Sequence, residues 1–175
     1  YTLTVTNLEA IDDITVLGTS VKTGAVANIT MNATNGVIAT LTMGNATVGP
    51  TVNFTNLAAT TNTHTGVLTV TNGALTYTRD DAAVARSTVG GNITMTKGSL
   101  TLGSAITTGG TSSMANDFLL ALGTETYNNK GGNFTHAGTS TITASSGTLV
   151  LDATGASHDL ILTTALTVPN LTVLA

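Results

Sequence analysis

The stretch GNITMTKGSLTLG, residues 91–103, contains two short runs of alternating apolar and polar residues separated by Lys97-Gly98. The stretch VLTVTNGALTYT, residues 67–78, repeats the phrase, because residues 68–77 match residues 93–102 without gaps at an offset of 25. The alternation predicts strands with aliphatic residues on one face and Thr on the other, and glycine marks the corner between them. We therefore predict a chain of similar β-coils.

Shorter copies of the phrase extend the repeat in both directions. Ile-Thr-Met at 29–31 lies 39 residues before Leu-Thr-Val at 68–70, and Phe-Thr-His at 134–136 lies 41 residues after Ile-Thr-Met at 93–95. The second half of the phrase, Gly-small-Leu-x-apolar, recurs at 147–151. These spacings fit one or two units of about 20 residues.

A unit of this size is too small to bury its own apolar face, so stacking on its neighbours stabilises it. We predict a single all-β domain over residues 1–175, folded as a parallel β-solenoid (β-helix) of about 20-residue coils. A β-sandwich with donor-strand exchange remains the alternative, because Asn35-Gly36 and Asn72-Gly73 are typical of hairpin turns. Residues 79–87 and 113–122 break the pattern and are predicted insertions with a possible helical turn.

The composition excludes several classes of protein. Only 8% of the residues are charged, whereas Thr accounts for about forty of the 175. The five Lys and Arg residues are scattered, and a nucleic-acid surface needs a concentrated basic patch, so nucleic-acid binding is excluded. No apolar run approaches the roughly 18 residues of a transmembrane helix, so we expect no membrane insertion. The chain has no Cys and hence no disulfide or thiolate site.

The sequence offers few candidates for catalysis or metal binding. His64, His136 and His158 are far apart, which indicates surface or corner histidines rather than a zinc site. The pairs Asp12-Asp13 and Asp80-Asp81 are expected in solvated turns, with a weak Ca²⁺ contact between subunits as the alternative. The Gly-x-Ser-x-Gly elbow and the P-loop are both absent. We therefore expect no enzyme, no metal site and no cofactor.

Seven Asn-x-Thr sequons allow N-glycosylation. They begin at Asn28, Asn32, Asn45, Asn53, Asn92, Asn133 and Asn170. The first residue is Tyr1 rather than Met, from which we expect either a cleaved leader or a longer parent chain. Both expectations indicate an extracellular, cell-surface protein.

Residues 131–175 resemble the β-strand repeats of very large bacterial and archaeal surface proteins. Those repeats typically run Gly-Asn-Phe-Thr-His-x-Gly-Thr-x-Thr, then a Gly-containing strand, then Asn-Leu-Thr-Val, which here are residues 132–141 and 170–173. The resemblance covers residues 66–175 and extends only loosely to 1–65. It implies an extracellular, right-handed parallel β-helix that acts as a stalk, adhesin or surface-layer element, and it brings no catalytic residues.

Both ends of the sequence lie inside a strand pattern and lack a polar cap. Apolar residues alternate at Tyr1, Leu3 and Val5 and again at Leu171 and Val173. An uncapped coil exposes strand edges and core, so we predict that these residues form assembly ends. Their expected partners are copies of the chain or adjoining repeats of a longer one. The predicted function is a structural protein of an extracellular filament, surface layer or stalk, assembled through end-to-end β-strand contacts.

Two other functions stay open. An adhesin or carbohydrate-binding module needs an aromatic platform, for which the chain offers three Tyr and three Phe residues. An ice-binding protein is the second, because Thr-x-Thr triplets occur at 40–42, 69–71 and 94–96. Flat ice-binding solenoid faces need a nearly constant coil length, however, and the units here vary.

Overall fold

The structure, a computed structural model, describes residues 2–6, 11–16, 26–32, 37–45, 47, 49–57, 63–64, 66–80, 87–154 and 156–175. These residues form strands joined by turns and corners. The strands are β1 (Thr2–Thr6), β2 (Ile11–Val16), β3 (Val26–Asn32), β4 (Val37–Met43), β5 (Thr51–Leu57), β6 (Thr63–His64), β7 (Leu68–Val70), β8 (Ala74–Asp80), β9 (Ser87–Val89), β10 (Ile93–Met95), β11 (Gly98–Leu102), β12 (Ile106–Thr108), β13 (Ser112–Met114), β14 (Phe118–Gly123), β15 (Thr126–Asn129), β16 (Phe134–His136), β17 (Thr141–Ala144), β18 (Thr148–Asp152), β19 (Leu160–Leu162) and β20 (Leu171–Leu174).

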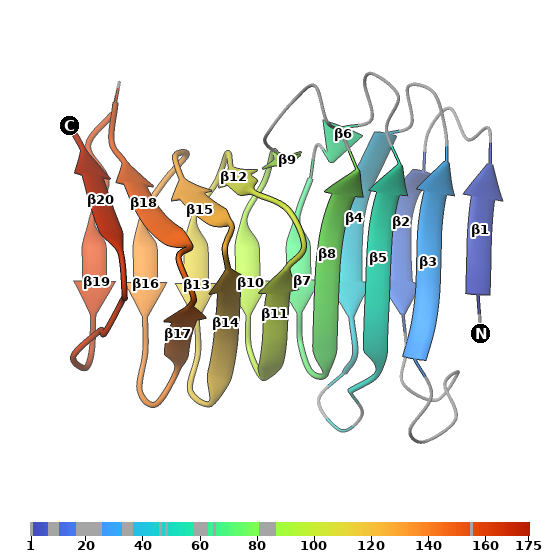
Figure 1. Cartoon of the computed structure of the whole chain (residues 1–175), viewed down its shortest axis with the longest axis horizontal. Coiled ribbons are helices and arrows are strands. Elements are labelled where there is room, and N and C mark those ends of the chain that lie inside the picture. Colours follow the sequence, from blue (N-terminus) through green and yellow to red (C-terminus); the bar gives the residue numbers. More distant parts are fainter. Residues whose placement is uncertain are drawn as a thin grey trace.

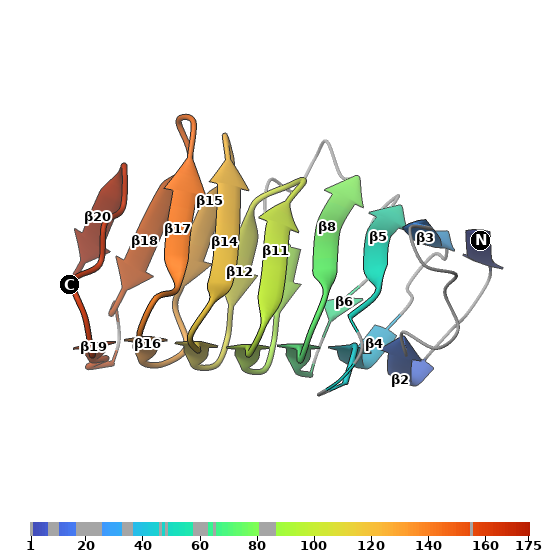
Figure 2. The ribbon, with the colours of Figure 1, turned by 90° about the horizontal axis from the view of Figure 1, so that it is seen from below.

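The strands form two hydrogen-bonded sheets that run the length of the molecule (Figure 1). Sheet A contains β1, β3, β5, β8, β11, β14 and β17 in that order. The second sheet has 13 strands, which we divide into face B (β2, β4, β7, β10, β13, β16 and β19) and face C (β6, β9, β12, β15, β18 and β20). The two faces join at β4, which pairs with both β6 and β7. Figure 2 shows face B along the lower edge, with the strands of sheet A rising from it.

Coil length follows from the pairing register. Leu75, Leu100, Leu120 and Ile142 occupy one row of sheet A, so successive coils hold 25, 20 and 22 residues. From β7 to β18 the chain visits face B, sheet A and face C in turn, so each of these coils contributes a strand to each side. The last coil contributes β19 to face B and β20 to face C, and its described residues form no strand of sheet A. This confirms the predicted parallel β-solenoid with coils of about 20 residues.

The β-sandwich alternative is wrong for the described residues. A sandwich is built from antiparallel hairpins, whereas every strand pairing in this part of the chain is parallel. Asn72-Gly73, which suggested a hairpin, forms a corner between β7 on face B and β8 on sheet A, and these strands do not pair with each other. Gly73 supplies a φ of 103° that the corner needs. Asn35-Gly36 lies outside the described residues.

The predicted repeat identifies equivalent strands in the middle of the chain but not at residues 29–31 and 147–151. Residues 93–95 pair with 68–70, and residues 134–136 lie in the same row two coils further on. Residues 29–31 do not belong to this row, because they lie in β3 of sheet A. Residues 147–151 enter β18 on face C, whereas the two matching phrases lie on sheet A. Buried residues alternate with half-buried ones in β10 of face B and β11 of sheet A, whereas on face C β12 is buried at all three positions and β15 at its last three. Alternation in the sequence therefore does not identify the side that a strand occupies.

The predicted insertion at 113–122 is wrong. These residues form the end of β13, a turn and most of β14, and alternate side chains from Phe118 to Leu122 are buried. The run is apolar at every position from Phe118 to Leu122, which hides its period of two in the sequence. Of the other predicted insertion, residues 79–80 end β8 and residue 87 begins β9, while 81–86 lie outside the described residues.

The core consists of inward-facing rows that run along the solenoid axis. In sheet A, Phe54 and Tyr77 pair in register and their rings stack with centroids 5.4 Å apart. In face B, Met95 and Met114 occupy one row and are fully buried. Each coil therefore covers the apolar side chains of the coil before it, and burial of any row depends on the coil that follows.

Candidate functional site

The C-terminal end of the solenoid carries exposed apolar side chains. Among the described residues the large exposed ones all lie in β19 and β20: Leu160, Ile161, Leu162, Leu171, Val173 and Leu174. Leu160 and Leu171 are 41% and 48% exposed, whereas Phe134 and Leu149, their partners one coil back, are 1% and 0% exposed. These two inward rows thus end on apolar residues that no described strand covers.

Strand edges are open at the same end. Within the described residues, β17, β19 and β20 each pair with one strand only. At the other end of the molecule, β1 pairs only with β3 and β2 only with β4 in the part of the chain that the structure describes. An open edge presents a row of backbone N–H and C=O groups that can bond another strand.

The structure distributes the predicted assembly residues between these two ends. Leu171 and Val173 lie in β20, and Leu3 and Val5 lie in β1, the N-terminal edge strand of sheet A. Tyr1 lies outside the described residues. Sequence reasoning missed β19, although its three consecutive apolar residues differ from the apolar-Thr-apolar pattern of β7 and β10.

Face B repeats one backbone bonding scheme from coil to coil. The first residue of each strand donates its N–H to the C=O of the corner residue that precedes the next strand. The donor and acceptor pairs are Leu68 with Asn92, Ile93 with Thr111, Ser112 with Asn133 and Phe134 with Asp159, at 2.9–3.0 Å. The residue that follows each strand donates in return to the last residue of the strand before it, as Ala137 does to Met114 at 3.0 Å.

Asparagine side chains reinforce this corner. Asn92 Oδ1 accepts the N–H of Thr111, and Asn133 Oδ1 accepts the N–H of Asp159, both at 2.9 Å. Asn133 Nδ2 also donates to Asp159 Oδ2 at 3.4 Å. The corner residues 92, 111, 133 and 159 therefore form a column, and at two of its steps a side-chain oxygen accepts the backbone N–H of the next corner residue.

Other sequon asparagines also hold the coils together. Asn53 Nδ2 donates to Asn28 Oδ1, and Asn170 Nδ2 donates to the C=O of Gly147, both at 3.0 Å. Asn45 Oδ1 accepts the N–H of Thr47 at 3.0 Å within its own turn. The side chain of Asn32 lies outside the described residues. These bonds give the sequon positions a structural role that the sequence motif does not reveal.

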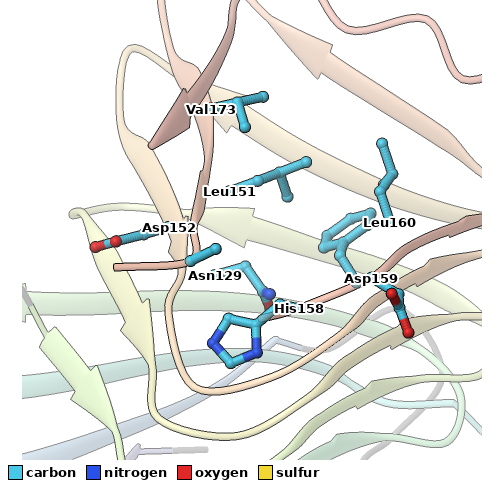
Figure 3. A pocket seen from close by; sticks show the side chains of 9 residues that line it. Asn129, Leu151, Asp152, His158, Asp159, Leu160 and Val173 are labelled. Atoms are coloured by element: carbon cyan, nitrogen blue, oxygen red, sulfur yellow. The ribbon is translucent and has the colours of Figure 1, made fainter. Parts of the chain in front are cut away.

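A cavity of about 140 Å³ lies at the corner between β18 and β19 (Figure 3). The equivalent corners hold three residues, 109–111, and four residues, 130–133, but this one holds seven, 153–159. Leu151 and Val173 border the cavity from face C, and Leu160 borders it from face B. The longer corner therefore leaves open a space that shorter corners fill.

One coil back, hydrogen-bonded polar side chains fill the same corner. Ser112 Oγ lies 2.8 Å from the Tyr127 hydroxyl and also donates to Asn129 Oδ1, while Asn129 Nδ2 donates to the C=O of Gly132. Burial raises the pKa of Tyr127 above its usual range, so the phenol stays neutral. The rings of Tyr127 and Phe134 meet edge to face with centroids 6.3 Å apart. This network fixes Asn129 and Phe134, which line the cavity.

His136, predicted at the surface or a corner, is 1% exposed, and the prediction is wrong for this residue. It follows Met114 in the inward row of face B. Its Nε2 lies 2.9 Å from the C=O of Ser140, and its Nδ1 has no hydrogen-bond partner among the described residues. His158 lies in the corner before β19, and the side chain of His64 is outside the described residues.

The described residues offer no group of three or more His, Asp or Glu side chains that could hold a metal ion. Asp12, Asp13 and Asp80 lie in strands β2 and β8 rather than in the expected turns, and Asp81 lies outside the described residues. Asp13 pairs in register with Thr40 of β4, and Asp80 pairs with Leu57 of β5.

Two features bear on the alternative functions, the burial of the aromatic side chains and the row of Thr on face B. The described aromatic side chains, Phe54, Tyr77, Phe118, Tyr127 and Phe134, are all buried, so none of them forms an exposed sugar platform. Thr42, Thr69 and Thr94 share one outward row of face B, followed by Ser113 and Thr135. The next position reads Gly44, Thr71, Thr96 and Ala115, so a double row of Thr spans only two coils.

In the part of the chain that the structure describes, no helix has the length and hydrophobicity to cross a lipid bilayer. No family model, curated protein or solved structure matches this chain.

Proposed function

We propose that the chain is a structural β-solenoid of an extracellular filament, surface layer or stalk, and that it lengthens by end-to-end contacts with copies of itself. The contrast between Leu171, 48% exposed, and Leu149, fully buried in the same row, carries this proposal. Burial of apolar surface contributes about 25 cal/mol per Å². A further coil over this end would recover that contribution for every inward row.

The open strand edges support the same proposal. β17, β19 and β20 at one end, and β1 and β2 at the other, each have an edge without a strand partner in the described residues. A head-to-tail contact between two different surfaces that does not close into a ring produces a filament. The extracellular setting rests on the resemblance to surface-protein repeats and on the uncharged, Thr-rich composition.

The test uses two Lys substitutions at this end. Val173 is 65% exposed in an inward row, whereas Ile161 is 42% exposed in the outward row of face B that follows Thr135. We expect Val173→Lys to weaken self-association at least about tenfold, because a charge buried without a partner is costly. Ile161→Lys adds the same charge at the same end but points it to solvent, and should leave association within about twofold of the wild type.

Analytical ultracentrifugation over a concentration series measures association, and negative-stain electron microscopy shows whether the particles are rods joined at their ends. A wild-type chain that stays monomeric at every concentration would refute self-assembly and leave adjoining repeats of a longer chain as the cover of this end. Equal effects of the two substitutions would refute a contact through the inward rows.

A further inference from the structure

We propose that the edge of β19 and the neighbouring corner cavity bind an extended polypeptide segment, which adds to face B as a parallel strand. The segment carries apolar residues at alternate positions and is preceded by a corner residue whose N–H bonds Asp159. This inference gives the chemistry of the partner at β19 and the corner before it, and it rests on the proposed function.

The backbone of face B already defines how such a strand bonds. Phe134 N–H donates to Asp159 C=O at 3.0 Å, and His136 C=O accepts from Thr163 N–H at 3.1 Å. Leu160 and Leu162 are the register partners of Phe134 and His136. In the same scheme, Leu160 N–H donates to the corner residue of the added segment, and Leu162 C=O accepts an N–H from beyond its strand. The segment must therefore run parallel to β19.

Asp159 supplies the corner acceptor. It stands next in the column in which Asn92 Oδ1 accepts Thr111 N–H and Asn133 Oδ1 accepts Asp159 N–H, each at 2.9 Å. The Asp159 side chain is exposed. A carboxylate is an acceptor only, and its bond to a backbone N–H is stronger than that of a neutral amide. The column thus ends on a group suited to one more backbone donor.

The side chains set the pattern of the segment. Its first inward residue lies beside Leu160, at the cavity that Leu151 and Val173 also border (Figure 3). Its second inward residue covers Leu162, which is 43% exposed. The residue between them faces outward beside Ile161. Apolar side chains at the first and third positions therefore match the exposed ends of the two inward rows.

A strand fits this place better than a small molecule. Ligand pockets usually enclose about 300–1,000 Å³, whereas this cavity measures about 140 Å³. That space suits one side chain, and the adjoining strand edge offers backbone groups at the spacing of a β-ladder. An extended segment uses both features at once, as in strand addition to a sheet edge.

The chain itself supplies the probe for the test. A synthetic peptide of residues 90–97, Gly-Gly-Asn-Ile-Thr-Met-Thr-Lys, has the corner and strand of β10, which stacks on β7 in this fold. The control peptide, Gly-Gly-Asn-Thr-Ile-Thr-Met-Lys, has the same composition with the apolar phase shifted by one residue. Titration of each peptide into the full-length protein, followed by NMR of the backbone amides, measures affinity and location.

We expect the first peptide to bind and to shift the amides of residues 159–163, and the control peptide to bind at least about fivefold more weakly. Asp159→Ala should weaken binding of the first peptide about fivefold, which corresponds to one hydrogen bond of about 1 kcal/mol. Asp159→Asn keeps the acceptor found at Asn92 and Asn133, so its affinity should stay within about twofold of the wild type.

The outcomes separate this inference from the proposed function. If neither peptide binds at protein concentrations at which the chain is monomeric, while the chain self-associates at higher concentrations and Val173→Lys weakens that association, the strand site is wrong and end-to-end assembly stands. If the first peptide binds as expected but the chain stays monomeric, self-assembly is wrong and the strand site stands. Equal binding of both peptides, or shifts confined to other strands, would overturn the strand site.

Discussion

Gly98 provides the most direct test of how closely the coils approach each other. It has a φ of 104°, and a Cβ at this position would lie 1.9 Å from the carbonyl oxygen of Gly73 and 2.7 Å from its nitrogen. Ordinary contact begins at 3.4 Å, and both neighbours are backbone atoms that cannot rotate away. A methyl group here therefore forces two coils apart by more than 1 Å.

We expect Gly98→Ala to lower the free energy of unfolding by at least about 4 kcal/mol. Forcing Ala into this backbone conformation costs about 1–3 kcal/mol. Separation of the coils also lengthens the bond from Ser99 N–H to Gly73 C=O, now 2.8 Å, which contributes about 1 kcal/mol. Looser packing between the buried Leu75 and Leu100 supplies the remainder, since large losses in cores arise from such disrupted contacts.

Gly123→Ala is the matched control. Gly123 has a φ of 59°, but a Cβ there would meet no atom within 4 Å, so only backbone strain of about 1 kcal/mol is expected. Urea unfolding followed by far-UV circular dichroism measures both variants. The difference between them, about 3 kcal/mol or more, isolates the clash. If Gly98→Ala costs no more than Gly123→Ala, the coils do not approach closely at this corner and the reasoning is refuted.

Buried and hydrogen-bonded polar groups provide three further tests. His136→Met should change the free energy of unfolding by no more than about 1 kcal/mol, because it loses the contact of Nε2 with Ser140 C=O at 2.9 Å but also removes a buried Nδ1 without a partner among the described residues; a loss above about 2 kcal/mol in urea unfolding would contradict this. Tyr127→Phe should cost about 1 kcal/mol in the same assay by removing the bond to Ser112 at 2.8 Å, and an unchanged midpoint would argue against that bond. Hydrogen bonds from Thr154 lower the pKa of Asp152, so its contribution to stability is present above the unfolded carboxyl pKa of about 3.9 and is lost as the pH falls through the lower folded pKa. Asp152→Asn should flatten that acid loss of stability, and identical acid-unfolding profiles would rule out the linkage.

The sequence predicted the fold where equivalent residues are spaced evenly. A parallel solenoid places residues 93–95 beside 68–70, so a gap-free match at one offset translates directly into strand pairing. The same reasoning failed for residues 29–31, which lie on sheet A. Alternation reports that one face of a strand is buried and does not report which of three sides the strand occupies.

The candidate site was predicted only in part. Leu171 and Val173 were found because they follow Asn170 at the close of a recognisable phrase. Leu160 was missed, because the Leu-Ile-Leu sequence of β19 lacks the apolar-Thr-apolar pattern by which β7 and β10 were recognised. Its exposure of 41% depends on what lies above it in space, and no local pattern encodes that. His136 was predicted to be exposed because it is polar, but it occupies an otherwise apolar, buried row.

Differences in coil length arise at the corners, and they affect which strand the C-terminal end can bind. β16 and β19 both have three residues, although the corners before them hold four and seven. An added strand bonds to the strand edge and to the corner residue before it, so it needs a strand of constant length and a side-chain acceptor, not a constant coil. β19 and Asp159 keep both, and the longer corner adds the cavity beside Leu160. The seven-residue corner therefore leaves the backbone register of face B unchanged. The cavity beside it limits the size of the first inward side chain of a strand that binds to β19.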